Sequence, residues 1–171
     1  MKKYVWILGL SFFLVFVYGL DAHSQPKEVT EPGITTYYVT SKVLPVGEGR
    51  VYMSYEAIGT NVNDAGDGLF HNSTVRCLGG MTFEKGVFED ERGWCSFNLQ
   101  DGDKVFSTYK YAGQAKPGGT GFSKGTVTLM GGTGKCAGIQ GSFELTRFTP
   151  RSALEGIGQS YTKGNIKYKL P

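Results

Sequence analysis

The feature that most constrains the fold is a succession of short β-type runs separated by glycine-rich turns, which continues from residue 34 almost to the C-terminus. Apolar and polar residues alternate within these runs, as Met53 and Tyr55 do with Tyr52, Ser54 and Glu56. β-branched and aromatic residues dominate them, which is typical of strands. No long stretch holds a helical period, so the chain is predicted to be all-β.

The expected strands cover residues 34–44, 50–57, 70–78, 81–88, 94–99, 105–111, 125–130, 139–148 and 164–170. Turns such as 63–68, 101–103 and 116–119 contain the Gly, Asn and Asp residues that hairpins need. Eight or nine antiparallel strands must close or form a sandwich, because exposed edges invite aggregation. Frequent strand glycines favour strong coiling. We therefore predict a single-domain, closed, antiparallel eight-stranded barrel over residues 34–171, with room inside for side chains or one small ligand.

The N-terminus is typical of an export signal. Lys2 and Lys3 precede an uncharged run over residues 4–19, and Ala22-His23-Ser24 offers small residues for cleavage before Gln25. Residues 1–24 are therefore predicted to be a signal peptide. The alternative is an uncleaved anchor, since about 20 apolar residues span a bilayer. However, no cluster of Lys or Arg follows the apolar run.

Cleavage would leave a mature protein in the periplasm or outside the cell. Its first residues, 25–33, are polar and contain two prolines, and we expect them to be flexible. No second hydrophobic run follows, so no membrane association is expected after cleavage. The formal net charge is +3 and the basic residues do not cluster, which argues against nucleic acid as a partner.

Three cysteines occur in the chain. Export would place them where disulfides form. Cys77 and Cys95 lie in β-type runs on either side of a hairpin, so we favour a disulfide between them, with Cys136 as a buried thiol. The alternative is three reduced thiols that pack as small hydrophobes.

The segment from Gly125 to Leu145 contains Gly131-Gly132-Thr133-Gly134-Lys135-Cys136-Ala137-Gly138 between two β-type runs. This pattern resembles the glycine-rich strand–turn–strand element of the allene oxide cyclase and dirigent-like superfamily, and the strands around Tyr55 and Phe70 resemble exported bacterial proteins of that barrel type. The resemblance covers about 25 residues strongly and implies an eight-stranded barrel in which this element links two late strands. Cys136 replaces an aromatic residue of the pattern. No functional residue of the family maps onto this chain.

Few residues are suited to acid–base or metal chemistry. After cleavage His71 is the one histidine left, and we expect it to pack in a strand rather than to catalyse. A pair of Cys136 and His71 would need the glycine-rich bend to reach that strand. The acidic turns 63–68 and 101–103 lack the spacing of a calcium loop, so no metal and no cofactor is predicted.

Polar residues on strands are the remaining candidates. Tyr52 and Glu56 share one face of their run, and Asn72 shares a face with Arg76 on the next run. If these faces point into the barrel, the four residues would orient a small ligand. The alternative is that these residues face solvent, or that they form one satisfied ion pair in a filled barrel.

The leading interpretation is a binding protein for a small, largely apolar ligand. The alternatives are an isomerase or cyclase that orients a lipid-like substrate, and a structural or interaction module with a filled barrel. Trimers occur among the similar proteins, so a homo-oligomer stays open.

Overall fold

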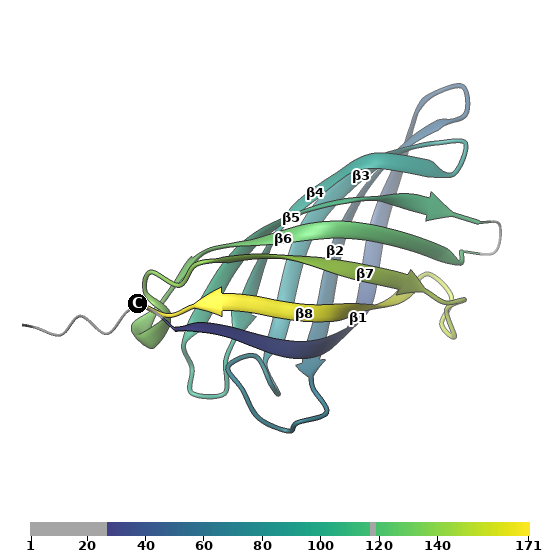
Figure 1. Ribbon diagram of the computed structural model, residues 1–171. Coiled ribbons are helices and arrows are strands. Elements are labelled where there is room, and N and C mark those ends of the chain that lie inside the picture. Colours follow the sequence, from purple (N-terminus) through teal and green to yellow (C-terminus); the bar gives the residue numbers. More distant parts are fainter. Residues whose placement is uncertain (1–26, 117–118) are drawn as a thin grey trace, which may run out of the picture.

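A computed structural model describes residues 27–116 and 119–171 (Figure 1). The elements are β1 (Glu28–Gly47), β2 (Arg50–Val62), β3 (Thr74–Glu84), β4 (Val87–Asn98), β5 (Lys104–Ala115), β6 (Gly121–Gly132), the 3-10 helix η1 (Gly134–Cys136), β7 (Gly141–Thr149) and β8 (Gly158–Lys169). Each strand pairs antiparallel with the next, and β8 pairs with β1, which closes the barrel. The predicted all-β, single-domain, eight-stranded barrel is confirmed.

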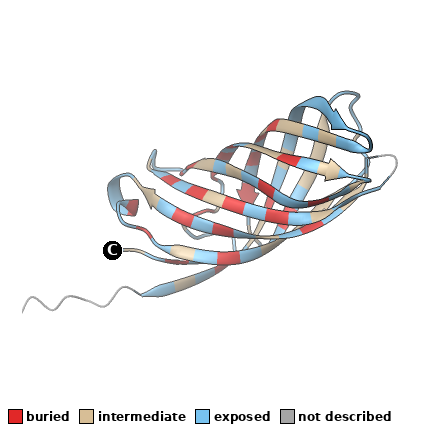
Figure 2. Ribbon diagram, turned by 90° about the horizontal axis from the view of Figure 1, so that it is seen from above, coloured by how far each residue is buried: buried red, intermediate tan, exposed pale blue. Residues whose placement is uncertain are grey.

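Burial alternates along the strands, as the red and pale blue bands of Figure 2 show. On β5, Val105, Ser107, Tyr109 and Tyr111 are buried and the residues between them are not. Successive side chains of a strand point to opposite faces, so one face of each strand lines the interior and the other meets solvent. The core therefore lies inside the barrel.

The first strand of the barrel begins at Glu28, before the expected residue 34. The predicted flexible segment 25–33 is wrong for its larger part, because Glu28–Gly33 belong to β1 and pair with β8 from Lys169 to Gly164. This pairing supplies the hydrogen bonds that close the barrel, and it outweighs the local preference of the prolines for loops. The predicted signal peptide, residues 1–24, lies outside the described residues, as do Gln25 and Pro26.

Two further strand boundaries differ from the expectation. Strand β3 runs through Gly79 and Gly80, where the sequence suggested a break, and the chain reverses at Lys85-Gly86, whose φ angles are +52° and +85°. Residues 70–73 lie in the β2–β3 loop rather than in a strand, so His71 is a loop residue. Glycine is common in turns, but in β3 it makes room for side chains of other strands, Tyr109 of β5 over Gly79 and Tyr52 of β2 over Gly80.

The two ends of the barrel differ. At the end that holds η1, the β2–β3 loop folds inward, and its Phe70 ring packs edge-on against Phe97 (5.3 Å between centroids) and Tyr168 (5.7 Å). Ile139 and Cys136 are buried at the same end. The hairpins that join β1 to β2 and β3 to β4 project from the other end (Figure 1). One end is therefore plugged by core residues.

The disulfide Cys77–Cys95 is present and links directly opposed positions of β3 and β4, as predicted. Cys136 is a free cysteine with no exposed surface, which confirms its expected packing role. A disulfide is consistent with an oxidising compartment.

Candidate functional site

The barrel encloses a cavity of about 290 Å³. Its lining is mostly apolar and aromatic, with Met53, Phe88, Phe97, Val127, Phe143 and Ile166 among the residues that surround it. These side chains come from five different strands, because the inward faces of the strands contribute to the same space. The volume lies at the lower end of the range for small-molecule sites.

A buried ion pair joins β7 to β4 across the interior of the barrel. Arg147 donates one hydrogen bond from Nη1 to Glu91 Oε1 (2.6 Å) and a second from Nη2 to Oε2. The Glu91 side chain is fully buried, and that of Arg147 is 16% exposed. Such two-pronged pairing suits the planar guanidinium and stabilises a carboxylate that has no access to water.

Tyrosines extend this pair into a network. Tyr55 donates its hydroxyl hydrogen to Glu91 Oε1, and the hydroxyl oxygens of Tyr55 and Tyr109 lie 2.6 Å apart. A phenol has one hydrogen, so Tyr109 is the donor to Tyr55. The guanidinium carbon of Arg147 also lies 4.8 Å from the centre of the Tyr111 ring, within cation–π range. The network thus satisfies its own polar groups.

The protonation states follow from the same contacts. Burial raises the pKa of Tyr109 to about 12, and it raises the pKa of Tyr55 and of Tyr111 above the usual range of tyrosine. Burial alone would lower the pKa of Arg147, but the hydrogen bonds and the charge of Glu91 outweigh it and raise that pKa. Near neutral pH the cavity therefore presents uncharged phenols and one compensated ion pair.

Two glycines make the position of Tyr109 possible. Gly79 on β3 and Gly93 on β4 are paired across the sheet, and a Cβ atom on either would lie 2.1 Å from the Tyr109 hydroxyl oxygen. No other residue type fits under this side chain without movement. The glycines that resemble turn residues in the sequence are therefore part of the site.

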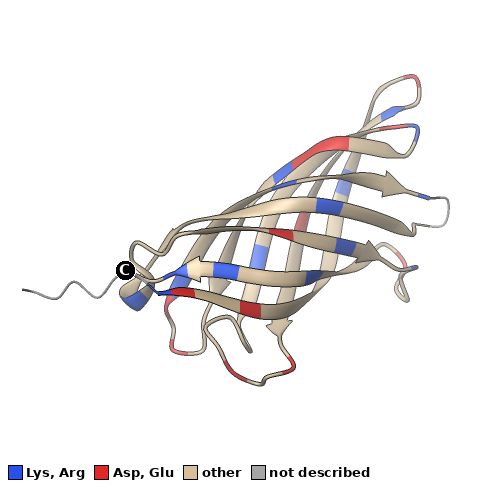
Figure 3. Ribbon diagram, in the orientation of Figure 1, with Lys and Arg blue, Asp and Glu red and all other residues tan. Residues whose placement is uncertain are grey.

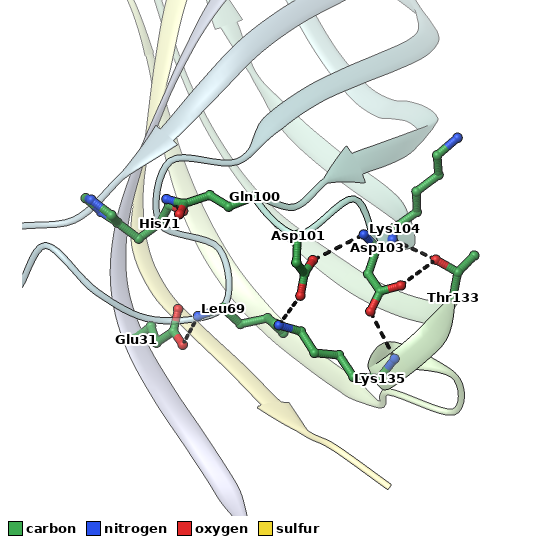
Figure 4. A network of polar contacts seen from close by, with 9 residues as sticks. All are labelled: Glu31, Leu69, His71, Gln100, Asp101, Asp103, Lys104, Thr133 and Lys135. Atoms are coloured by element: carbon green, nitrogen blue, oxygen red, sulfur yellow. Dashed lines mark hydrogen bonds and ion pairs between the residues drawn. The ribbon is translucent and has the colours of Figure 1, made fainter.

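Glu31 holds the plug of the closed end. Its carboxylate accepts hydrogen bonds from the backbone N–H of Leu69 (2.8 Å) and Phe70 (3.4 Å) and from the Tyr168 hydroxyl. Figure 4 shows the contact to Leu69. Asn61 adds a side-chain hydrogen bond to Ser73 Oγ (2.9 Å). These contacts fix the β2–β3 loop across the barrel.

The acidic turn 101–103 is also structural. Asp103 accepts a hydrogen bond from the backbone N–H of Lys135 (3.0 Å) in η1, and the Lys135 ammonium pairs with Asp101 (Figure 4). The turn therefore joins the β4–β5 loop to η1. Within residues 27–116 and 119–171, no group of three His, Cys, Asp or Glu side chains is arranged to hold a metal ion.

The four residues predicted to line the site do not line the cavity. Arg76 and Glu56 form an ion pair on the outer surface, with 2.5 Å between Nε and Oε1 and the Arg76 side chain 62% exposed. Tyr52 is 42% exposed, and Asn72 is an exposed loop residue. The prediction chose the wrong face of β2, because the more apolar face, with Met53, Tyr55 and Ala57, is the one that turns inward.

Glu91 and Arg147 were not predicted as site residues from the sequence, for different reasons. Arg147 follows Phe143 and Leu145 at two-residue intervals, so strand alternation alone could have placed it inside. Glu91 sits in the charged run Glu89-Asp90-Glu91-Arg92, which is typical of a solvated surface. A bulge between Phe88 and Glu91 turns both side chains inward despite their odd spacing.

The comparisons with known proteins add no relative: no family model matches the chain, and no curated protein matches it. Lys and Arg are spread over several strands of the described part of the chain rather than gathered in one patch (Figure 3).

Within residues 27–116 and 119–171, no helix has the length and apolar character needed to cross a membrane.

Proposed function

We propose that this protein binds a small, mostly apolar ligand inside the barrel. The observation that carries the proposal is the cavity of about 290 Å³ with its apolar and aromatic lining. An apolar cavity of about 150 Å³ holds one benzene molecule. A ligand of roughly two fused rings therefore matches the available space.

The polar network supports binding rather than acid–base catalysis. The Glu91 carboxylate accepts two hydrogen bonds from Arg147 and one from Tyr55, and its side chain has no exposed surface. A general base must reach the proton that it removes. Glu91 has no such access to the cavity, so the arrangement favours a structural role for the pair over the isomerase or cyclase alternative.

The test is a calorimetric titration of the purified mature protein with 2-ethylnaphthalene. We expect saturable one-to-one binding. Leu145 lines the cavity, so Leu145→Trp should fill the space and abolish binding. Ile58 is an exposed residue of β2, so Ile58→Trp is the matched control and should bind as the parent does.

Circular dichroism verifies that both variants keep their strands. No binding to the parent protein would overturn the proposal and would favour the third interpretation, a filled barrel with a surface function. Equal binding to both tryptophan variants would show that the ligand sits on the outer surface.

We also propose that the chain acts in the periplasm or outside the cell and is a member of the allene oxide cyclase and dirigent-like superfamily. The disulfide supports the first part. The second is supported by the eight-stranded barrel, in which the Gly131–Gly138 bend joins the late strands β6 and β7. Mass spectrometry of the protein from its host envelope tests the location: we expect a chain that begins at Gln25, and an N-terminus at Met1 would contradict it.

A further inference from the structure

The ion pair with Glu91 uses only part of the Arg147 guanidinium. Of the five N–H groups of this planar cation, one on Nη1 and one on Nη2 donate to the Glu91 carboxylate. A second edge, formed by Nε–H and the other N–H of Nη2, faces away from Glu91. This edge presents the same fork of two donors as the one that Glu91 occupies.

Arg147 is also the charged residue of the network that a ligand can reach. Its side chain is 16% exposed and lines the cavity, whereas the Glu91 side chain has no exposed surface. The cavity beside the guanidinium is aromatic, since its carbon lies 4.8 Å from the ring centre of Tyr111 and 5.9 Å from that of Phe88. A molecule in the cavity can therefore place an apolar body against these rings and a polar group at Arg147.

The N–H groups of the second edge need an acceptor. Water that enters the cavity can accept from them, but a ligand that displaces this water must bring an acceptor of its own, because the N–H groups otherwise lose their hydrogen bonds. A pure hydrocarbon brings none. The edge therefore favours a ligand that carries an oxygen acceptor.

The charge balance of the pair restricts this acceptor. The Glu91 carboxylate already compensates the charge of Arg147. A carboxylate on the ligand would lose its hydration beside a cation that is already paired, and a cation on the ligand would be repelled by the guanidinium. An uncharged acceptor gains a charge-assisted hydrogen bond at a smaller cost of desolvation. The cavity therefore favours an uncharged ligand.

We propose that the ligand is an uncharged, mostly apolar molecule with an oxygen acceptor, such as a carbonyl, which accepts hydrogen bonds from the Nε–Nη2 edge of Arg147. This inference rests on the proposed function, since it names the chemistry of a ligand for the same cavity. Arg147 thus has two roles, because one edge of its guanidinium pairs with Glu91 and the other recognises the ligand.

Three molecules of similar shape test it: 2-acetylnaphthalene, which carries a carbonyl, 2-ethylnaphthalene, which lacks one, and 2-naphthoate, which is anionic. Dissociation constants are measured for the parent protein and for Glu91→Gln/Arg147→Met, in which both charges are removed. The double substitution should weaken binding of the ketone at least about tenfold more than binding of the hydrocarbon, the loss of hydrogen bonds from a charged donor. The hydrocarbon corrects for any change in the shape of the cavity, because its complex never contains these bonds.

Met53→Leu is the matched control, since Met53 lines the cavity without a hydrogen-bond donor in its side chain and the exchange nearly conserves volume. It should change the affinities for the ketone and the hydrocarbon by the same factor. Circular dichroism verifies that each variant keeps its strands.

A second variant tests the charge balance. Glu91→Gln leaves the Arg147 guanidinium without its carboxylate, so a carboxylate on the ligand can take that place. 2-Naphthoate should then bind at least about tenfold more tightly than it binds the parent protein, whereas the hydrocarbon should not gain. An unchanged affinity for 2-naphthoate in a folded Glu91→Gln protein would overturn the placement of the polar group at Arg147. If this variant does not fold, the double variant decides.

The outcomes separate the two proposals. If none of the three molecules binds, the proposed function fails and the inference fails with it. If 2-ethylnaphthalene binds the parent protein but the double substitution weakens ketone and hydrocarbon equally, the proposed function holds and the inference is overturned. Binding of 2-naphthoate to the parent protein as tight as that of the ketone would likewise overturn the assignment of an uncharged ligand.

Discussion

The Arg147 guanidinium and the Glu91 carboxylate meet inside the barrel through two parallel hydrogen bonds, although β7 and β4 are not neighbours in the sheet. The pair therefore bridges the interior rather than the wall. Removing one partner would leave the other charged and buried, whereas removing both would not.

We accordingly expect Arg147→Met to lower the free energy of unfolding by about 3–5 kcal/mol. The double variant Glu91→Gln/Arg147→Met should recover most of that loss, because no unpaired charge remains and the glutamine oxygen still accepts from Tyr55. Urea denaturation measures both. The outer pair is the control: Arg76→Met should cost less than about 1 kcal/mol. Equal losses in the single and double variants would contradict a buried, coupled pair.

The glycine under Tyr109 leads to a second expectation. Gly79→Ala should destabilise the barrel by about 1–3 kcal/mol, because its Cβ would meet the Tyr109 hydroxyl oxygen at 2.1 Å. In a Tyr109→Phe background the same substitution should cost less. Gly33→Ala is the control, since its nearest atom is the flexible tip of Ile166 at 3.1 Å. An equal cost of Gly79→Ala in both backgrounds would show that backbone contacts decide it.

Alkaline pH should unfold the protein through its buried phenols. Folding raises the pKa of Tyr109 from 10.0 to about 12, so the folded state holds this proton more tightly than the unfolded state. The resulting stabilisation is complete below pH 10 and is lost as the pH rises toward about 12. Tyr55 and Tyr111 act in the same direction. Phenolate absorbance and circular dichroism, recorded together, should show a group of tyrosines that ionise only as the strands are lost.

A single smooth ionisation of all tyrosines in a protein that keeps its strands would contradict the buried network.

The plug is expected to loosen when its acceptor is removed. Glu31→Ala leaves the backbone N–H groups of Leu69 and Phe70 without a partner, so their hydrogen exchange should accelerate at least about tenfold. The control is Glu28→Ala. Glu28 lies on β1 like Glu31, but its carboxylate forms an exposed ion pair with Lys169 of β8, so its removal should change neither exchange rate. Unchanged exchange in Glu31→Ala would mean that the Phe70 ring and the Asn61–Ser73 hydrogen bond secure the loop without the carboxylate.

Much of the architecture could be predicted because it depends on local rules. Alternation and turn chemistry were enough for an all-β domain of eight or nine strands, strand glycines favoured the closed barrel, and the hairpin between Cys77 and Cys95 favoured the disulfide. The site was harder because a period of two residues shows that a strand has two faces without showing which one is inside. Glu56 and Arg76 were candidates for the site only on the assumption that their faces point inward, and they lie on the outer surface.

The interior network depended on features that local rules do not show. A bulge reverses the alternation before Glu91, and the meaning of Gly79 depends on Tyr109, 30 positions away in the sequence. The inward orientation of Arg147 could have been predicted, because Arg147 follows Phe143 and Leu145 at regular two-residue spacing. Its partner Glu91 could not have been predicted, since no local sequence pattern connects β4 with β7.

The pairing of β1 with β8 also determines the order of events during synthesis. Glu28 is paired with Lys169, so the first strand must wait for the last before the sheet can close. Hairpins from β1 to β7 can form as the chain emerges, but the cavity does not exist until the two ends meet. A fold with contacts this distant along the chain reaches its native state slowly. Until then the edges of β1 and of the newest strand stay open, which makes assembly the stage at which this protein is most exposed to aggregation.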